Sequence, residues 1–286
     1  MSDSASRYEL VIEPSRGWFH ISWREFWEYR DLLVLLVRRD FLSKYKQTLL
    51  GPIWFILQPL LTTIMFVIVF GRVAQIPTDD IPQPLFYLCG LLGWNYFAQN
   101  VTTGATTFTA NAHLFGKVYF PRVILPAAAI ISNLFAFALQ FIPFAGFFVY
   151  YKFFTAAGHN FNLDWTVVFL PLVLLQASLF SLGVSLWMSA STAKYRDLVH
   201  LNQFIVQLWM FATPVIYPLS KIPPRLEWIA WINPMAAVVE CFRVTLLGRG
   251  TLSPEFVATS VLLSLGVTAS GILVFQKMER TAVDTV

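Results

Sequence analysis

Residues Ile222 to Gly250 have the sequence IPPRLEWIAWINPMAAVVECFRVTLLGRG. It is too apolar for an ordinary surface loop. An internal Asn-Pro nevertheless breaks it into pieces shorter than the roughly 20 apolar residues that cross a membrane as one helix. Glu240 and Arg243 are three positions apart in its second half, so on a helix they share a face and can pair. The stretch therefore predicts a segment that enters the neighbourhood of a membrane without crossing it.

The composition of the chain indicates a polytopic membrane protein. Of the 286 residues, 57% are hydrophobic and only 13% are charged, whereas a soluble domain usually has about 25% charged residues. The two cysteines, Cys89 and Cys241, lie in apolar segments without the spacing of a metal or redox site. We interpret both as packing residues, which is the usual role of a buried free cysteine.

Continuous apolar runs predict an all-α membrane protein with six spans: Ile53–Phe70, Leu85–Asn111, Val123–Tyr151, Trp165–Ala190, Leu198–Tyr217 and Phe256–Phe275. The basic residues set the orientation. With the N-terminus in the cytoplasm, 14 of the 20 Lys and Arg residues fall on the cytoplasmic side, as the positive-inside rule requires. We expect residues 1–22 to be a cytoplasmic segment, 48–275 the transmembrane domain and 276–286 a cytoplasmic tail.

Residues 23–47, WREFWEYRDLLVLLVRRDFLSKYKQ, precede the first predicted span. Aromatic and aliphatic residues recur there at roughly helical spacing, with charged residues between them, and the apolar run LLVLLV is too short to span. This pattern predicts an amphipathic helix in the interface between headgroups and water. The alternative is a cytoplasmic helix that packs on a partner, and one helix can do both.

The predicted spans lack the groups that an ion-coupled transporter or an enzyme needs. They contain no Asp or Glu, whereas ion-driven transporters usually carry an ionisable residue inside the membrane. The chain has no phosphate-binding loop of the GxxxxGK[ST] type. Its histidines, His20, His113, His159 and His200, are scattered and predict no metal site. We therefore expect no cofactor in this chain, no catalytic residues, and an energy source in another subunit.

Polar and aromatic residues within the spans leave two interpretations open. The hydroxyls and the glycine of VTTGATTFTAN, residues 101–111, suit close packing of helices or a polar wall along a pathway. The aromatic content of 16% suits interfacial belts, which are common in membrane proteins. It also suits contact with the apolar faces of sugar rings.

Several stretches together resemble the membrane subunit of ABC-type polysaccharide and polyol-phosphate exporters, a family that moves O-antigen, capsule or teichoic-acid chains. The resemblance extends from Trp23 to Phe275, and its motifs occur in the family's order. They are KYKQTLLGPIWFILQPLL (44–61), GLLGWNYF (90–97), NAHLFGKVYFPRVILP (111–126), KYRDL (194–198), ATPVIYP (212–218) and NPMAAVVECFR (233–243). The chain departs from the family in its tail, where Ala282-Val283-Asp284 replaces a common Phe-Ala-Asp.

The resemblance implies a homodimer of six-helix subunits with one cytoplasmic ABC ATPase subunit beneath each, and these ATPases would bind ATP and Mg. The interface helix and the two inner loops would receive the ATPase's motion. The coupling residues implied are His113, Leu114, Phe115, Lys117, Phe120, Arg122, Tyr195 and Arg196.

The resemblance also implies that the opening stretch forms two re-entrant helices on the outer side, at about Pro224–Ile232 and Pro234–Leu247, within a gate segment at residues 222–248. We expect Trp228, Trp231, Glu240 and Arg243 to belong to this gate. A structural Glu240–Arg243 pair is the first interpretation, and direct contact with a passing pyrophosphate or sugar is the alternative. Channel-lining aromatics are expected at Phe55, Phe66, Trp94, Tyr96 and Phe97.

The function that the resemblance implies is ATP-driven export of a lipid-linked polysaccharide, with O-antigen as the first expectation, from the cytoplasmic to the outer side of a bacterial inner membrane. The partners would be a second copy, two ATPase subunits, the glycan and membrane lipid, with no nucleic acid. One alternative is a permease that exports drugs, lipids or haem. Another is a membrane enzyme acting on lipid-linked sugars, which would need a cluster of acids, histidines or a metal site.

Overall fold

The computed structural model describes residues 27–45, 51–111, 120, 123–195 and 197–283, apart from the side chains of residues 44, 45, 108 and 279–283. All regular elements in these ranges are helical, which confirms the predicted all-α fold. The α-helices in chain order are α2 (Arg30–Tyr45), α3 (Trp54–Phe66), α4 (Gln83–Ala110), α6 (Ile124–Phe154), α7 (Leu170–Lys194), α8 (Leu198–Phe211), α9 (Glu227–Ile232), α10 (Pro234–Leu247) and α11 (Pro254–Val283).

Four helical segments in the described ranges are long and apolar enough to cross a membrane: Gly51–Val73, Ile124–Phe154, Trp165–Lys194 and Pro254–Met278. The first includes α3 and a π-helical continuation, Val67–Val73. The predicted span Leu85–Asn111 corresponds to α4, which has 28 residues and carries amides and hydroxyls. The predicted span Leu198–Tyr217 is helical only as far as Phe211, the end of the 14-residue α8. Membrane crossing by α4 and α8 therefore stays a prediction.

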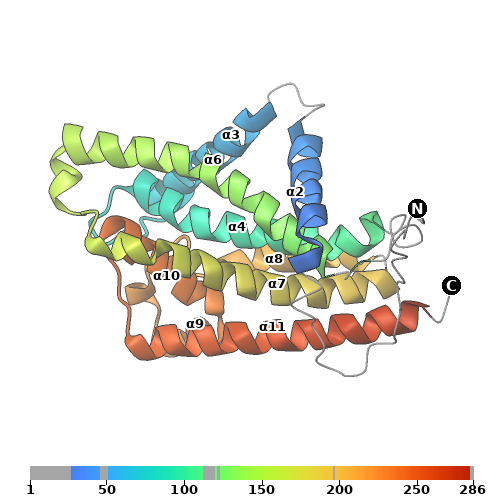
Figure 1. Ribbon diagram of the computed structural model, residues 1–286. Helices are drawn as coiled ribbons and strands as arrows, with labels where there is room; N and C mark the ends of the chain where they lie inside the picture. The colour runs from blue at the N-terminus through green and yellow to red at the C-terminus, as the bar shows by residue number, and fades with distance from the viewer. Residues whose placement is uncertain (1–26, 46–50, 112–119, 121–122, 196, 284–286) are drawn as a thin grey trace, which may run out of the picture.

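The long helices share one general direction (Figure 1). Helices α4, α6, α7 and α11 run along the bundle, whereas α2 crosses it near the start of α6. Helix α11 ends near that end, while α9 and α10 lie at the opposite end, beside the start of α11. The arrangement places α2 and the helix pair α9–α10 apart along the length of the helices.

Small residues bring α7 and α11 into close contact. A Cβ atom on Gly183 of α7 would lie 2.6 Å from the Cα atom of Thr268 of α11, and one on Gly271 would lie 2.5 Å from the Gly183 carbonyl oxygen. Because no side chain separates the two backbones, the Thr268 hydroxyl reaches across and donates a hydrogen bond of 2.7 Å to the Leu179 carbonyl. Small residues and polar bridges of this kind hold membrane helices together.

Asn100 of α4 is the centre of a buried polar cluster that joins three helices. Its side-chain oxygen accepts from Asn133 Nδ2 of α6 at 2.8 Å, and its own Nδ2 donates to Ser181 Oγ of α7 at 3.0 Å. Ser185 Oγ donates to the Asn100 carbonyl, also at 3.0 Å. These bonds fix the rotation of α4 relative to its neighbours, because each side chain must face its partner.

Helix α2 packs on the start of α6 through a small cluster of its own. Leu36 is buried against Phe120, Ile124 and Leu125. Arg39 links α2 to the end of α4 with a hydrogen bond of 2.9 Å from its guanidinium to Asn111 Oδ1. The predicted interface helix therefore lies across the end of the bundle and is tied to two of its helices.

Candidate functional site

The broken segment of the sequence forms a short helix pair, α9 and α10. Asn233 caps α10, because its side chain accepts a 3.1 Å hydrogen bond from the backbone N–H of Met235, and Pro234 occupies the first turn, where its missing N–H is not needed. Gly248 ends α10 in the left-handed conformation at φ +63°, which glycine adopts without a steric cost. Helix α9 begins at Glu227 rather than at Pro224, because residues 223–226 form a turn closed by a 2.8 Å bond from Leu226 N to the Pro223 carbonyl.

Asn233 also anchors the junction of the two short helices to the end of α8. Its Oδ1 accepts a hydrogen bond of 3.0 Å from Trp209 Nε1. Its Nδ2 donates to Thr213 Oγ1 at 2.9 Å and to the Ala212 carbonyl at 3.2 Å. One buried amide thus caps α10 and holds the turn that follows α8, so these two parts of the chain are positioned together.

Glu240 and Arg243 form an ion pair inside the protein. Arg243 NH1 lies 2.9 Å from Glu240 Oε2, and both side chains are only 2% exposed. The pair is tied to its surroundings on both sides: Arg243 NH2 donates to the Val215 carbonyl at 3.0 Å, and Glu240 Oε1 accepts from Thr251 N at 2.9 Å. The guanidinium also lies over the ring of Phe86, 4.0 Å from its centre.

These contacts give the pair a structural role. They connect α10 to α4 through Phe86, to the turn after α8 through Val215, and to the segment before α11 through Thr251. Gly250 allows the last contact, because a Cβ atom there would lie 2.9 Å from Glu240 Oε1. The Glu240 carboxylate and both terminal nitrogens of the Arg243 guanidinium already have partners within the protein, which favours the structural interpretation over direct contact with a charged substrate.

The two tryptophans predicted for the gate have different surroundings on α9. Trp231 packs edge-to-face on Phe256 of α11 with ring centres 5.3 Å apart, and its Nε1 lies 3.5 Å from Glu227 Oε1. Trp228 is 59% exposed. Trp231 therefore fixes α9 to the bundle. The ring of Trp228 lies at the surface of this copy of the chain.

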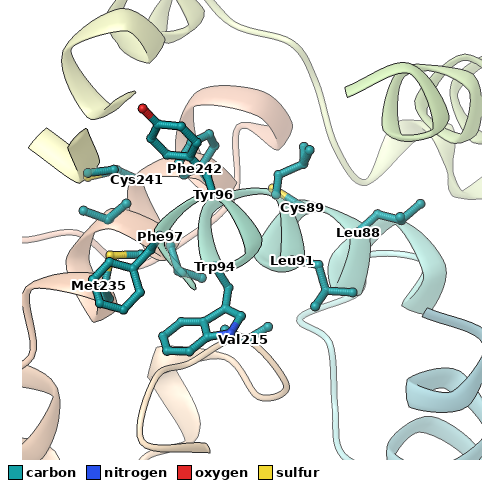
Figure 2. Close-up of a cluster of buried hydrophobic side chains, with 14 of the residues drawn as sticks. Leu88, Cys89, Leu91, Trp94, Tyr96, Phe97, Val215, Met235, Cys241 and Phe242 are labelled. Carbon is teal, nitrogen blue, oxygen red and sulfur yellow. The ribbon is translucent and has the colours of Figure 1, made fainter. Parts of the chain in front are cut away.

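Three of the predicted lining aromatics are buried within this copy of the chain. Trp94, Tyr96 and Phe97 project from α4 in different directions, with Trp94 directed toward Val215 (Figure 2). Phe97 stacks on Phe180 with ring centres 5.4 Å apart. The Tyr96 hydroxyl lies 2.7 Å from Ser178 Oγ. Their contacts within this copy are those of core residues, and a place on a channel wall stays a prediction.

The other two predicted lining residues, Phe55 and Phe66, are half-buried on α3. Phe66 packs edge-to-face on Tyr87 of α4 with ring centres 5.8 Å apart. Around them α3 exposes a row of large apolar side chains, including Ile64 and Met65. Phe55 and Phe66 thus border a surface that another molecule or the membrane must cover.

The predicted coupling residues fall largely outside the described ranges; these are His113, Leu114, Phe115, Lys117, Arg122 and Arg196. Phe120 is buried in the cluster beneath α2. Tyr195 is 54% exposed at the end of α7, with Lys194 Nζ 5.1 Å from its ring centre. The structure therefore brings Phe120 and α2 together and leaves the coupling role of the whole set as a prediction.

Sequence reasoning missed the two asparagines on which the packing depends, Asn100 and Asn233. The Asn-Pro at 233–234 indicates a helix start, but the contacts of its amide with α8 join residues that are distant in the sequence. Among the described residues, no group of three or more His, Cys, Asp or Glu is placed to hold a metal ion.

Comparison with known proteins adds a family and named relatives to this geometry. The family model for ABC-2 type transporters matches residues 31–247, which include both short helices and all of α2 except its first residue. An O-antigen export system permease protein of Klebsiella pneumoniae is 30% identical over 250 residues, covering 87% of this chain and 92% of the relative. One from Myxococcus xanthus is 32% identical over 225 residues, covering 77% and 82%. A polysialic acid transport protein of Escherichia coli is 24% identical over 232 residues, covering 80% and 84%.

Proposed function

The chain belongs to the ABC-2 type transporter family, and from this premise we propose that it is the membrane-spanning subunit of an ATP-driven exporter of a lipid-linked polysaccharide. One observation carries the proposal: the similarity to O-antigen export permeases runs through 87% of this chain. Among the possible glycans, O-antigen is favoured, because those permeases are more similar to this chain than the polysialic acid transporter is.

The proposed topology has six spans in a bacterial inner membrane. They are the segment 51–73, α4, α6, α7, α8 and α11, and both termini are cytoplasmic. The positive-inside pattern of the sequence supports this orientation. The position of α2 and of the end of α11 toward the same end of the bundle supports it as well (Figure 1). Helix α2 then lies at the cytoplasmic interface, and α9 and α10 lie on the outer side.

Helices α9 and α10 form the proposed outer gate. Backbone that enters a membrane without crossing it must be buried in protein or line a wet cavity, and every residue of α10 except Val244 is buried. The Glu240–Arg243 pair and Asn233 hold α10 on the bundle, so the exposed Trp228 of α9 is the part free to meet a passing glycan.

A second copy completes the proposed channel. The exposed apolar faces of α3, with Leu61, Ile64 and Met65, and of α8, with Phe204 and Leu208, provide the surfaces for it. Phe55 and Phe66 lie beside the first of these surfaces, and they are the aromatics that the structure supports best as lining residues. Two such surfaces facing each other would enclose a path lined by carbon and aromatic groups, which suits the apolar faces of sugar rings.

The energy comes from a separate ATPase subunit beneath each copy in this proposal, and that subunit holds ATP and Mg. The sequence lacks a phosphate-binding loop of its own. The ATPase docks at α2 and at the loop that carries His113, Phe115 and Lys117. Because Leu36 and Arg39 tie α2 to the ends of α6 and α4, displacement of α2 would tilt these helices.

The experiment that tests the proposal is conditional depletion of this chain in its host. The amount of lipid-linked glycan on each face of the membrane is then measured. We expect glycan to accumulate on the cytoplasmic face. The intact gene should restore its export, and a variant lacking residues 224–247 should not. Normal surface polysaccharide after depletion would contradict the proposal and favour a permease for drugs, lipids or haem. Loss of glycan synthesis would favour the enzyme alternative.

A further inference from the structure

A groove of about 860 Å³ lies between α7 and α11, with α10 on its inner side. The two walls include exposed aliphatic residues, among them Leu172 and Leu175 of α7 and Leu265 of α11. The inner side includes Cys241 of α10, which is 7% exposed. The groove therefore opens on the outside of the bundle and reaches inward to the short helix that carries the ion pair.

The polar side chains that line the groove are already paired within the protein. Gln176 Nε2 donates to Ser260 Oγ at 2.6 Å. The hydroxyls of Thr245 and Ser264 donate to the carbonyls of Cys241 and Ser260, both at 2.7 Å. These donors are not available to an occupant, which meets mainly carbon surface. The chemistry of the groove therefore favours hydrocarbon over a sugar, a nucleotide or an ion.

The groove has the length of one membrane leaflet. Its lining on α11 runs from Pro254 to Leu265, a rise of about 16 Å, which is close to half of the roughly 30 Å hydrocarbon core. Its outer end lies near Trp165, which is 68% exposed at the start of the helical segment that leads into α7. Exposed tryptophan is typical of the boundary between hydrocarbon and headgroups.

We propose that this groove binds a hydrocarbon tail of a membrane lipid in the outer leaflet. The inference rests on the membrane orientation in the proposed function but does not depend on the exported substrate. The bound tail packs against Cys241 and Val244 of α10, so it supports the base of the proposed gate from the membrane side. The surfaces assigned to the second copy lie on α3 and α8, which leaves the α7–α11 groove facing lipid.

The test uses the full chain in vesicles of a phosphatidylcholine that carries a photoreactive diazirine in the middle of one acyl chain. After irradiation, cross-linked residues are mapped by mass spectrometry. We expect cross-links concentrated on the α7 and α11 walls of the groove, several-fold above those at exposed apolar residues of α11 outside the groove, such as Leu262. Cross-links spread evenly over all exposed apolar residues would overturn the proposal. Cross-links mainly between two copies would show that the groove is a protein interface instead.

Matched variants separate the groove from the general membrane surface. Ala258→Trp places a large ring on the groove wall, whereas Leu262→Trp makes the same change at a position that is 69% exposed and outside the groove. We expect Ala258→Trp to reduce cross-linking several-fold and Leu262→Trp to leave it unchanged. Equal cross-linking in both variants would contradict the proposal. If Ala258→Trp does not fold, the smaller Ala258→Leu change serves the same comparison.

A second measurement does not need the photoreactive lipid. Stripping lipid with detergent should lower the melting temperature of the natural chain more than that of Ala258→Trp, because the tryptophan fills the space that the tail leaves. An equal loss in both would contradict a supporting role of the tail. Neither measurement requires the ATPase or a glycan. Failure of export with lipid bound in the groove would thus overturn the proposed function alone.

Discussion

The guanidinium of Arg243 in α10 lies 4.0 Å from the ring centre of Phe86 in α4, while one of its nitrogens is 2.9 Å from Glu240 Oε2. A cation that is 2% exposed requires this degree of compensation, because its transfer from water is costly. The contact of the guanidinium with Phe86 therefore joins α10 to α4, while Glu240 of α10 balances the charge of Arg243.

Removing one partner of this pair should destabilise the protein strongly. Arg243→Met leaves the Glu240 carboxylate buried without its cation, and breaking a buried pair in this way costs about 3–5 kcal/mol. Thermal unfolding in detergent should show the loss. The matched change Arg225→Met, at an exposed cation of the same segment, should have little effect. Adding Glu240→Gln to Arg243→Met should recover part of the loss, and a fully additive double variant would contradict the pairing.

The Asn100 cluster predicts a second destabilising change. Asn100→Leu removes the hydrogen bonds to Asn133 and Ser181, and bonds between membrane helices contribute about 0.6–2 kcal/mol each. We expect a lower melting temperature for this variant than for Gln99→Leu, which changes the neighbouring half-buried amide. Equal melting temperatures would show that the cluster does not set the packing of α4.

The sequence predicts the helical fold and the segmentation of the chain well, because apolar runs and prolines act locally. The family resemblance implies a second short helix at about Pro234–Leu247, and the structure has these bounds, because Asn233 caps its start and Gly248 ends it. The sequence does not show that Asn233 contacts α8, or that Trp94 and Phe97 turn toward the core. Those facts depend on the rotation of each helix against its neighbours, which distant contacts determine.

The close contact of α7 and α11 predicts opposite effects for two glycine substitutions. In Gly183→Ala, the added Cβ atom would lie 2.6 Å from the Thr268 backbone and must push the helices apart. In Gly266→Ala, the new Cβ meets nothing within 4 Å, so helix propensity should stabilise the protein by as much as about 1 kcal/mol. Melting temperatures should therefore fall for the first variant and stay level or rise for the second. The reverse order would contradict the packing described.

Substitutions at the two tryptophans of α9 should affect stability and export differently. Trp231→Ala removes the packing on Phe256 and should lower the melting temperature. Trp228→Ala changes a ring that is 59% exposed and should leave the melting temperature unchanged while it alters export. Surface polysaccharide and thermal unfolding, measured for both variants, check this. Normal export by Trp228→Ala would remove this residue from the proposed gate.

The activity proposed for this chain is movement of a lipid-linked polysaccharide across a membrane, driven by an ATPase partner. The most direct measurement reconstitutes the purified chain with its ATPase partner in vesicles that carry the host's lipid-linked glycan. The ATPase and the glycan lie on the outer face of the vesicle, so that transport moves the glycan into the lumen. Glycan that becomes protected from an external glycosidase only when ATP is present is the predicted result. ATP hydrolysis at a normal rate, with the glycan remaining fully accessible to the glycosidase, would contradict the claim.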